Sequence, residues 1–237
     1  MSTIIGIDTS GPVLSVAVLR NGKIEYVSAQ NTGLTHSETL MPALDTALES
    51  CKIRCSDADC FAVAAGPGSF TGVRIGVCAA KGLAHAVNKP CMRVDAIEAL
   101  SMNFAYFDGL VCPILDARRH QVYCACFDVS SGFPERVLED DVCDLDTFLE
   151  KLPKDRRLLF LGDGLKTYAE ELKKCLPGAV LAPENLSQLR ADALCLLAQA
   201  HPEQWMEGQR LTPIYLRKPQ AERERDRRQK EKTDGSD

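Results

Sequence analysis

The chain has 237 residues, of which 45% are hydrophobic and 26% are charged, and its formal net charge at pH 7 is −5. These values are typical of a globular protein with one large domain or two small ones. No apolar stretch approaches the roughly 18 residues that a membrane span needs, and Asp8 interrupts the first apolar run too early for a signal peptide. We therefore expect a cytoplasmic protein that does not contact a membrane.

The charge is distributed unevenly along the chain. Residues 1–216 carry a net charge of −7, whereas residues 217–237 hold eight Lys/Arg and six Asp/Glu. Because an acidic body repels phosphate backbones, we do not expect tight RNA binding by the chain alone. The run from Glu222 to Lys232 has no apolar face, which predicts a disordered tail over residues 217–237, with a weak RNA contact by this tail left open.

Eleven cysteines are present, but no pair of them has the C-x-x-C spacing. Neither Cys51, Cys55 and Cys60 nor the pair Cys124 and Cys126 matches the spacing of a zinc site. In a reducing compartment, such thiols behave as small and often buried hydrophobic residues. We expect no metal site.

The N-terminal half predicts a β-meander followed by alternating helices and strands. Asn21-Gly22 is the signature of a two-residue hairpin turn. Thr35 and Glu38 form a capping box for a helix that runs to about Cys51, and Pro42 is expected to kink it. The predicted strands are 3–9, 13–20, 23–29, 61–65 and 91–94, and further helices are predicted at about 72–87 and 96–104.

The C-terminal half repeats this order of elements. Strands are expected near 110–115, 121–128, 135–140 and 157–161, and helices near 144–151, 165–174 and 187–200. The periodicity supports an α/β fold in two lobes. We expect an N-terminal lobe over 1–106 onto which the 187–200 helix packs back, a smaller lobe over 107–186, a closing segment over 187–216, and the tail.

The most informative segment is the glycine string, Gly66–Gly76, which follows a buried apolar run and precedes a helix. A strand, a glycine-rich turn and a helix in this order bring backbone N–H groups up to an anion or to another backbone. The spacing fits neither a Walker loop nor a dinucleotide-binding fingerprint. Asp8, Thr9 and Ser10 end the first strand, where open α/β sheets place ligand groups. Both segments could equally be hydrogen-bonded turns.

The helix that follows the glycine string has almost no polar face, so it must be covered on several sides. Its expected neighbour is the helix that starts at Thr35, and the small residues between them permit close approach. Two interpretations remain: plain core packing, or a helical pair that presents a surface to a second protein.

The chain resembles the TsaB (YeaZ) family of bacterial tRNA threonylcarbamoyladenosine synthesis in the glycine string and in several shorter motifs. Those motifs are Ile7–Ser10, Thr35–Glu38, Ala80–Ala84, Asp116–Arg119 and Tyr215–Arg217. The resemblance implies a duplicated ribonuclease-H-like fold, the architecture of actin, Hsp70 and sugar kinases. It also implies that the nucleotide site of that fold is vestigial and mainly structural here, with the residues Asp8, Thr9, Ser10, Gly68, Ser69, Thr71, Arg74 and Arg118.

The resemblance further implies protein partners. TsaB proteins use the helical pair to dimerise or to join the catalytic subunit TsaD, and they help to recruit the ATPase TsaE. The residues expected at this contact are His36, Leu40, Met41, Leu44, Leu48, Val77, Ala80, Lys81 and Ala84. The chain would then be a non-catalytic scaffold and activator for threonylcarbamoylation of adenosine 37 in tRNAs that read codons starting with A. It would reach tRNA only through the complex.

Two features separate the chain from TsaD. TsaD carries a metal-binding His-Met-Glu-Gly-His motif where this chain has Ala96–Leu100, without a histidine. TsaD also has a glycine-rich second phosphate loop, where this chain has the bulky residues Arg118 and Arg119, and close approach of a backbone to phosphate favours glycine. We expect no catalytic residue and no required cofactor, with weak ATP or ADP binding left open.

Two other classes of function are weighed against this one. An ATP-binding phosphotransferase or ATPase of the sugar-kinase type would use Asp8 for a metal ion and Gly68–Thr71 for phosphate. A metallo- or serine peptidase would need a metal cluster or an activated nucleophile, and no His-x-x-x-His, Glu-x-x-His or His/Ser/Asp set is evident.

Overall fold

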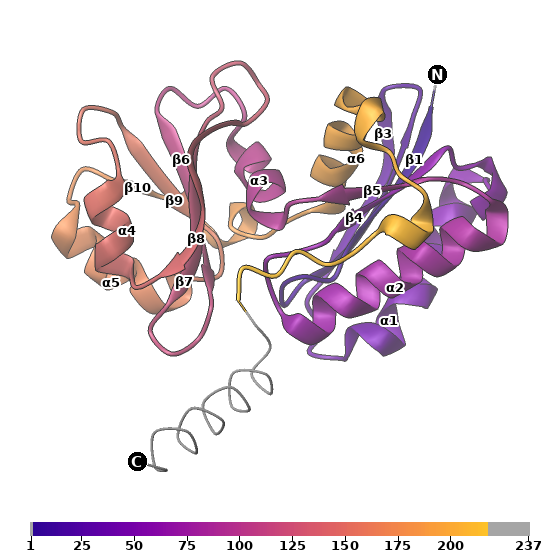
Figure 1. Cartoon of the computed structure of the whole chain (residues 1–237), viewed down its shortest axis with the longest axis horizontal. Coiled ribbons are helices and arrows are strands. Elements are labelled where there is room, and N and C mark those ends of the chain that lie inside the picture. The colour runs from indigo at the N-terminus through magenta and orange to yellow at the C-terminus, as the bar shows by residue number, and fades with distance from the viewer. Residues whose placement is uncertain (1, 218–237) are drawn as a thin grey trace, which may run out of the picture.

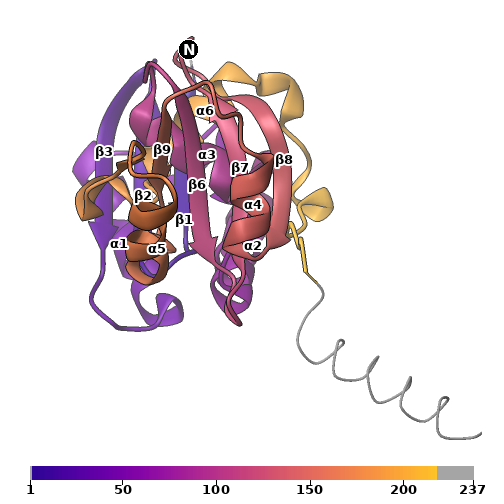
Figure 2. The same cartoon turned by 90° about the vertical axis from the view of Figure 1, so that its left-hand side faces the viewer.

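The computed structural model describes residues 2–217, which form two lobes, each built on one five-stranded sheet (Figure 1; Figure 2). The strands of the first sheet are β1 (Thr3–Asp8), β2 (Leu14–Arg20), β3 (Lys23–Gln30), β4 (Cys60–Ala64) and β5 (Cys91–Val94). The strands of the second sheet are β6 (Leu110–Asp116), β7 (Val122–Asp128), β8 (Glu135–Cys143), β9 (Leu158–Leu161) and β10 (Val180–Leu181). The helices are α1 (His36–Cys51), α2 (Phe70–Val87), α3 (Ala96–Ser101), α4 (Leu145–Lys151), α5 (Leu165–Cys175) and α6 (Ala191–Ala200).

The two sheets have the same topology. Their strand orders are β3-β2-β1-β4-β5 and β8-β7-β6-β9-β10. In each sheet the first three strands along the chain pair antiparallel as a meander, and the last two join the sheet in parallel through helical crossovers. The predicted duplicated ribonuclease-H-like fold is therefore confirmed.

The first sheet is covered on both faces, which explains why β1 and β4 are apolar along their whole length. Ile5 and Ile7 pack in one cluster with α1 and α2, whereas Ile4 packs in another cluster with α6. Helix α6 approaches the sheet closely: the Ala191 N–H donates to Ser15 Oγ at 2.9 Å. A Cβ atom at Gly6 would lie 2.8 Å from the Cys195 sulfur, so only glycine fits there.

The second sheet lies between α3 on one side and α4 with α5 on the other (Figure 1; Figure 2). Helix α3 also faces the first lobe and packs against both β6 and α6. Asp95 caps α3 by accepting from the Ile97 and Glu98 N–H groups, at 2.7 and 3.1 Å. Within residues 2–217, no helix combines the length and the apolar character needed to cross a bilayer.

Several local predictions are confirmed. Asn21 and Gly22 have φ angles of 53° and 81°, as a two-residue hairpin turn requires. The capping box is present, with the Thr35 N–H donating to the Glu38 carboxylate at 3.2 Å. Helix α2 begins at Phe70, two residues before the predicted start, because Ser69 Oγ accepts from the Gly72 N–H and caps it.

Other boundaries are wrong. The last helix begins at Ala191 and not at 187, because a short 3-10 turn over Glu184–Leu186 comes first and the Ser187 N–H donates back to the Glu184 carbonyl. The helix predicted over 96–104 ends at Ser101 and continues as a 3-10 turn. Strand β10 was not predicted, since two residues are too few to show a period. The predicted disordered tail lies outside the described residues, except for Arg217.

The C-terminal segment after α6 runs along α2 and then reaches the second lobe (Figure 1). The Lys81 ammonium donates to the Gln209 and Leu211 carbonyl oxygens at 3.4 and 3.1 Å. The Ile214 N–H donates to the Ala65 carbonyl at 2.7 Å. Arg217 then donates from its guanidinium to the Ala117 carbonyl at 3.2 Å, at the start of the turn between β6 and β7.

Candidate functional site

A cleft of about 750 Å³ lies between the two lobes and is lined by residues of both sheets. It opens at the carboxyl ends of β1 and β6, where open α/β sheets place ligand groups. Six of the eight predicted nucleotide-site residues line it, namely Asp8, Ser10, Gly68, Ser69, Thr71 and Arg118. The other two predicted residues, Thr9 and Arg74, do not.

Asp8 is the most perturbed carboxyl group of the cleft. It is only 1% exposed, and its Oδ1 accepts from the Ser10 N–H at 2.8 Å and from the Ser10 hydroxyl at 2.7 Å. Burial raises the Asp8 pKa to about 6, against the opposing effects of these hydrogen bonds and of nearby His36. Near neutral pH, Asp8 is therefore ionised at a free-energy cost.

The glycine string packs directly against the end of β1. The Ser69 N–H donates to the Ser10 carbonyl at 2.7 Å, and the Thr9 hydroxyl donates to the Gly72 carbonyl at 2.7 Å. A Cβ at Gly76 would lie 2.5 Å from Thr9 Oγ1. The glycines thus serve the close approach of two backbone segments, and two of the groups that could meet a phosphate, the Ser69 N–H and the Thr9 hydroxyl, are bonded within the protein.

Arg74 lies outside the predicted phosphate site, and this is a correction. Its Nε donates to the Tyr215 hydroxyl at 2.8 Å, and its guanidinium lies over the Phe70 ring, 3.8 Å from the centroid. The Phe70 and Tyr215 rings also stack, with centroids 5.2 Å apart. Arg74 lies in the second turn of α2, beside the C-terminal segment. It holds that segment in place, and its charge does not reach the cleft.

The second lobe contributes Asp116, Arg118 and Asp163 to the cleft. Arg118 pairs with Asp116 at 3.3 Å, and the Asp116 N–H donates to the Asp163 carboxylate at 2.9 Å. Burial raises the Asp163 pKa. Sequence reasoning missed Asp163, although Gly162-Asp163-Gly164 after a short apolar run is a signal that could have indicated it.

The cleft carries more acidic than basic side chains. Three carboxyl groups, those of Asp8, Asp116 and Asp163, line it and would repel phosphates, and the arginine in its lining, Arg118, is paired with Asp116. Among residues 2–217, no group of three or more His, Cys, Asp or Glu residues is placed to hold a metal ion by itself.

The cleft does gather a serine, a histidine and an aspartate, which the sequence pattern did not indicate. Ser10 donates to Asp8, while His36 Nε2 lies 2.8 Å from the Gly11 carbonyl oxygen. In a hydrolase triad the histidine stands between the nucleophile and the acid. Here His36 bonds to neither side chain, and instead it holds the start of α1 against the turn between β1 and β2.

The structure places most of the predicted partner contacts inside the monomer, and this is a second correction. Five of the nine, Leu40, Leu44, Val77, Ala80 and Ala84, are at most 3% exposed because they face the first sheet. Lys81 holds the C-terminal segment, and His36 holds Gly11. Met41 is 46% exposed, and Leu48 is half-buried.

The outward side of α2 is apolar and is only partly covered by the described residues. We call this surface the open face of α2. It consists of Ile75, Cys78, Ala79, Gly82, Leu83 and Ala86, all exposed or half-buried. A Cβ at Gly82 would meet no atom within 4 Å. An uncharged helical stripe over residues 75–86 is unusual on a surface that water covers, and it is typical of a contact with another protein.

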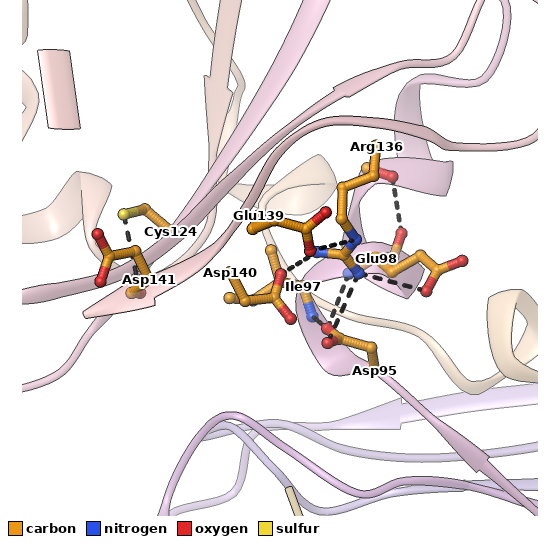
Figure 3. Close-up of polar contacts among 9 residues, drawn as sticks. Asp95, Ile97, Glu98, Cys124, Arg136, Glu139, Asp140 and Asp141 are labelled. Carbon is orange, nitrogen blue, oxygen red and sulfur yellow. Dashed lines mark hydrogen bonds and ion pairs between the residues drawn. The ribbon is translucent and has the colours of Figure 1, made fainter. Parts of the chain in front are cut away.

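A charged cluster lies apart from the cleft, where β8 meets the start of α3 (Figure 3). Arg136 reaches four carboxylates, those of Asp95, Glu98, Glu139 and Asp140, and its guanidinium lies 4.8 Å from the centre of the Phe127 ring. Burial and the neighbouring Asp140 carboxyl raise the Asp95 pKa well above its usual range. The cluster ties the edge of the second sheet to the crossover between the lobes, which is a structural role.

Comparison with known proteins relates the chain to one process. The family model TsaD: tRNA N6-adenosine threonylcarbamoyltransferase matches residues 27–224. The protein named tRNA threonylcarbamoyladenosine biosynthesis protein TsaB of Bacillus subtilis (strain 168) is 37% identical, over 93% of this chain and 96% of that protein. This chain belongs to the TsaB family. The Haemophilus influenzae protein of the same name is 29% identical, over 91% of this chain and 93% of that protein.

A solved structure agrees with the family assignment. YeaZ from Pseudomonas aeruginosa superposes with a TM-score of 0.78 at 26% identity, covering 91% of this chain and 100% of that one. The chain, as a TsaB family member, takes part in tRNA threonylcarbamoyladenosine biosynthesis. The fold, the glycine string and the packing against β1 thus belong to a protein of tRNA modification.

Proposed function

We propose that this chain is a non-catalytic scaffold and activator subunit, which forms a heterodimer with TsaD and supports the association of TsaE. Threonylcarbamoyl transfer to adenosine takes place on TsaD, and this chain reaches tRNA through the complex in the cytoplasm. The proposal needs no cofactor on this chain. In the absence of TsaD, the same surface supports a homodimer.

The cleft supports a non-catalytic role. The Ser69 N–H and the Thr9 hydroxyl, both of which could meet a phosphate, are bonded to Ser10 and Gly72. The region that corresponds to the TsaD metal motif is Ala96–Leu100, of which Ala96, Ile97, Ala99 and Leu100 are at most 1% exposed. A buried apolar helix cannot ligate a metal ion.

The single observation that carries the proposal is the open face of α2. An apolar stripe of this kind costs free energy in water, and burying it against a partner recovers about 25 cal/mol for each Å² covered. The contact is thus made by the outward residues of α2 together with Met41 of α1, and not by the buried residues that the family resemblance implied.

Replacing Gly82 by arginine tests this contact. Nothing lies within 4 Å of a Cβ at Gly82, and arginine stabilises a helix interior by about 1 kcal/mol relative to glycine, so the monomer should fold. The matched control is Gly178→Arg, at an equally open position in the second lobe. Size-exclusion chromatography with light scattering would follow each variant mixed with the TsaD of the same organism.

We expect the wild-type chain and Gly178→Arg to form a one-to-one complex, whereas Gly82→Arg stays separate from TsaD. A complex that forms equally well with both variants would show that α2 is not the interface. If the folded wild-type chain forms no complex at all, the scaffold role is wrong.

A further inference from the structure

The turn between β6 and β7, Ala117–Gln121, has an unusual backbone. Its three central residues, Arg118, Arg119 and His120, have φ angles of 64°, 56° and 59°. The turn is closed by the Ala117 N–H donating to the Gln121 carbonyl at 3.0 Å and the Gln121 N–H donating to the Arg118 carbonyl at 3.2 Å. Glycine and asparagine adopt left-handed backbone more cheaply than arginine does. The conformation of the turn therefore does not explain why cationic side chains occupy three such positions in a row, which points to a role in binding.

The three side chains extend into solvent. The Arg118 side chain is 86% exposed and its one ion pair is with Asp116. Arg119 and His120 are also exposed, and their side chains form no hydrogen bond or ion pair with any residue from 2 to 217. Of the two guanidinium groups on the turn, that of Arg118 faces one carboxylate, and that of Arg119 has no carboxylate partner among residues 2–217.

Arg217 adds to this positive surface. Its guanidinium donates to the Ala117 carbonyl at 3.2 Å, which places a third arginine beside the turn. Since residues 1–216 carry a net charge of −7, three neighbouring arginines contrast with the rest of the surface and would steer an anion to one place.

We propose that Arg118 and Arg119 bind the sugar–phosphate backbone of tRNA, and we refer to the Ala117–Gln121 turn with Arg217 as the basic turn. The proposal rests on the proposed function, because it adds an RNA contact to the complex that TsaD would form. Arginine presents a planar fork that suits phosphate, and consecutive cations on an exposed turn suit the repeated phosphates of a strand. A small nucleotide would need an enclosed pocket, and the adjoining cleft is lined by the carboxyl groups of Asp8, Asp116 and Asp163.

The test replaces both arginines by asparagine, Arg118→Asn with Arg119→Asn. Asparagine tolerates left-handed backbone, so the turn and the fold are kept while two charges are removed. The matched control is Lys173→Gln with Lys174→Gln, which removes the same charge from the exposed end of α5 in the same lobe. Binding of unmodified tRNA would be titrated by fluorescence anisotropy between 50 and 200 mM salt, for the full chain alone and for the full chain mixed with TsaD.

We expect the arginine variant to bind tRNA more weakly. The slope of log affinity against log salt concentration should also become less steep, by roughly one for each phosphate contact that is lost. The lysine variant should match the wild type. Equal weakening in both variants would mean a long-range effect of charge and would overturn the proposal. So would an absence of tRNA binding by both the chain and the mixture at 50 mM salt.

Complex formation is read separately by light scattering in the same buffer, which keeps this inference distinguishable from the proposed function. If TsaD binds the arginine variant normally while tRNA affinity falls, the basic turn is an RNA contact. If the arginine variant no longer binds TsaD, the turn is a contact with acidic protein groups, and the RNA proposal is wrong. If even the wild-type chain does not bind TsaD, the scaffold role is wrong. The titration of tRNA with the chain alone then shows whether Arg118 and Arg119 bind tRNA.

Discussion

Thr9 and Gly72 hold the two halves of the predicted phosphate site together: the Thr9 hydroxyl donates to the Gly72 carbonyl at 2.7 Å, and the Thr9 carbonyl lies where a Cβ of residue 72 would be. The start of α2 is thereby seated on the end of β1. The glycine string thus packs the two backbone segments together, and the stability of the first lobe depends on this contact.

Substituting Gly72 by alanine should destabilise the protein strongly. The added methyl group meets the Thr9 backbone, which cannot move without disturbing β1, and forced packing of this kind costs about 1–3 kcal/mol. The control Gly82→Ala, on the open face of α2, should stabilise the protein by up to about 1 kcal/mol. Urea unfolding followed by circular dichroism would compare the two. Equal effects would show that Gly72 is not under steric constraint.

Asp8 should make stability fall as pH rises. Its pKa is about 6 in the folded protein against 3.8 as the reference, so the folded state keeps a proton that the unfolded state has released between these values. The free energy of unfolding should therefore decrease as the pH rises through this window, by an amount on the order of 3 kcal/mol. Asp8→Asn should remove this decrease and be more stable than the wild type at pH 7.5.

The matched control for that measurement is Asp45→Asn, at an exposed position on α1. It should follow the wild-type profile of unfolding free energy against pH from 4 to 8. An Asp8→Asn profile that is parallel to the wild type would contradict the burial of the Asp8 charge.

Arg136 should contribute more to stability than a surface arginine. Its replacement by leucine leaves Asp95 and Asp140, with side chains 11% and 15% exposed, without their cation. Removal of one partner from a buried charge cluster costs about 3 kcal/mol. Because protonation of Asp95 relieves the repulsion, the destabilisation should be smaller at pH 5 than at pH 8.

Arg156→Leu is the control for Arg136. Arg156 pairs with Asp128 at 3.0 Å on a more exposed surface, where such a pair contributes about 1 kcal/mol or less. Thermal unfolding at both pH values would compare the variants. Similar destabilisation at pH 8 would mean that the Arg136 cluster is no more than a surface ion pair.

Much of the fold could be predicted because the local conformational preferences of the sequence agree with the tertiary packing in those segments. Asn21-Gly22, the Thr35 capping box and the alternation of strands and helices each specify one local conformation, and the repeat of this order indicates two lobes. The start of α6 could not be predicted, because Ser187 and Gln188 fit a helix cap as well as the 3-10 turn that precedes them.

The site was harder to predict than the fold. An apolar residue repeats along a helix in the same way whether it faces a sheet or a partner, so Leu44 and Ala80 could not be told apart from Cys78 and Gly82 by pattern alone. Arg74 could not be placed either, because its partner Tyr215 lies 141 residues away in the sequence. Asp163 comes from the second lobe and joins the cleft only through the fold.

The most direct test of the non-catalytic role is the rate of threonylcarbamoyladenosine formation in tRNA by this chain combined with TsaD and TsaE, with Asp8→Asn in place of the wild type. We expect a rate within about twofold of the wild type, because a tenfold decrease would need a loss of about 1.4 kcal/mol in transition-state stabilisation. A fall of a hundredfold or more, with the protein folded and the complex with TsaD intact, would make Asp8 a catalytic residue and the non-catalytic role wrong.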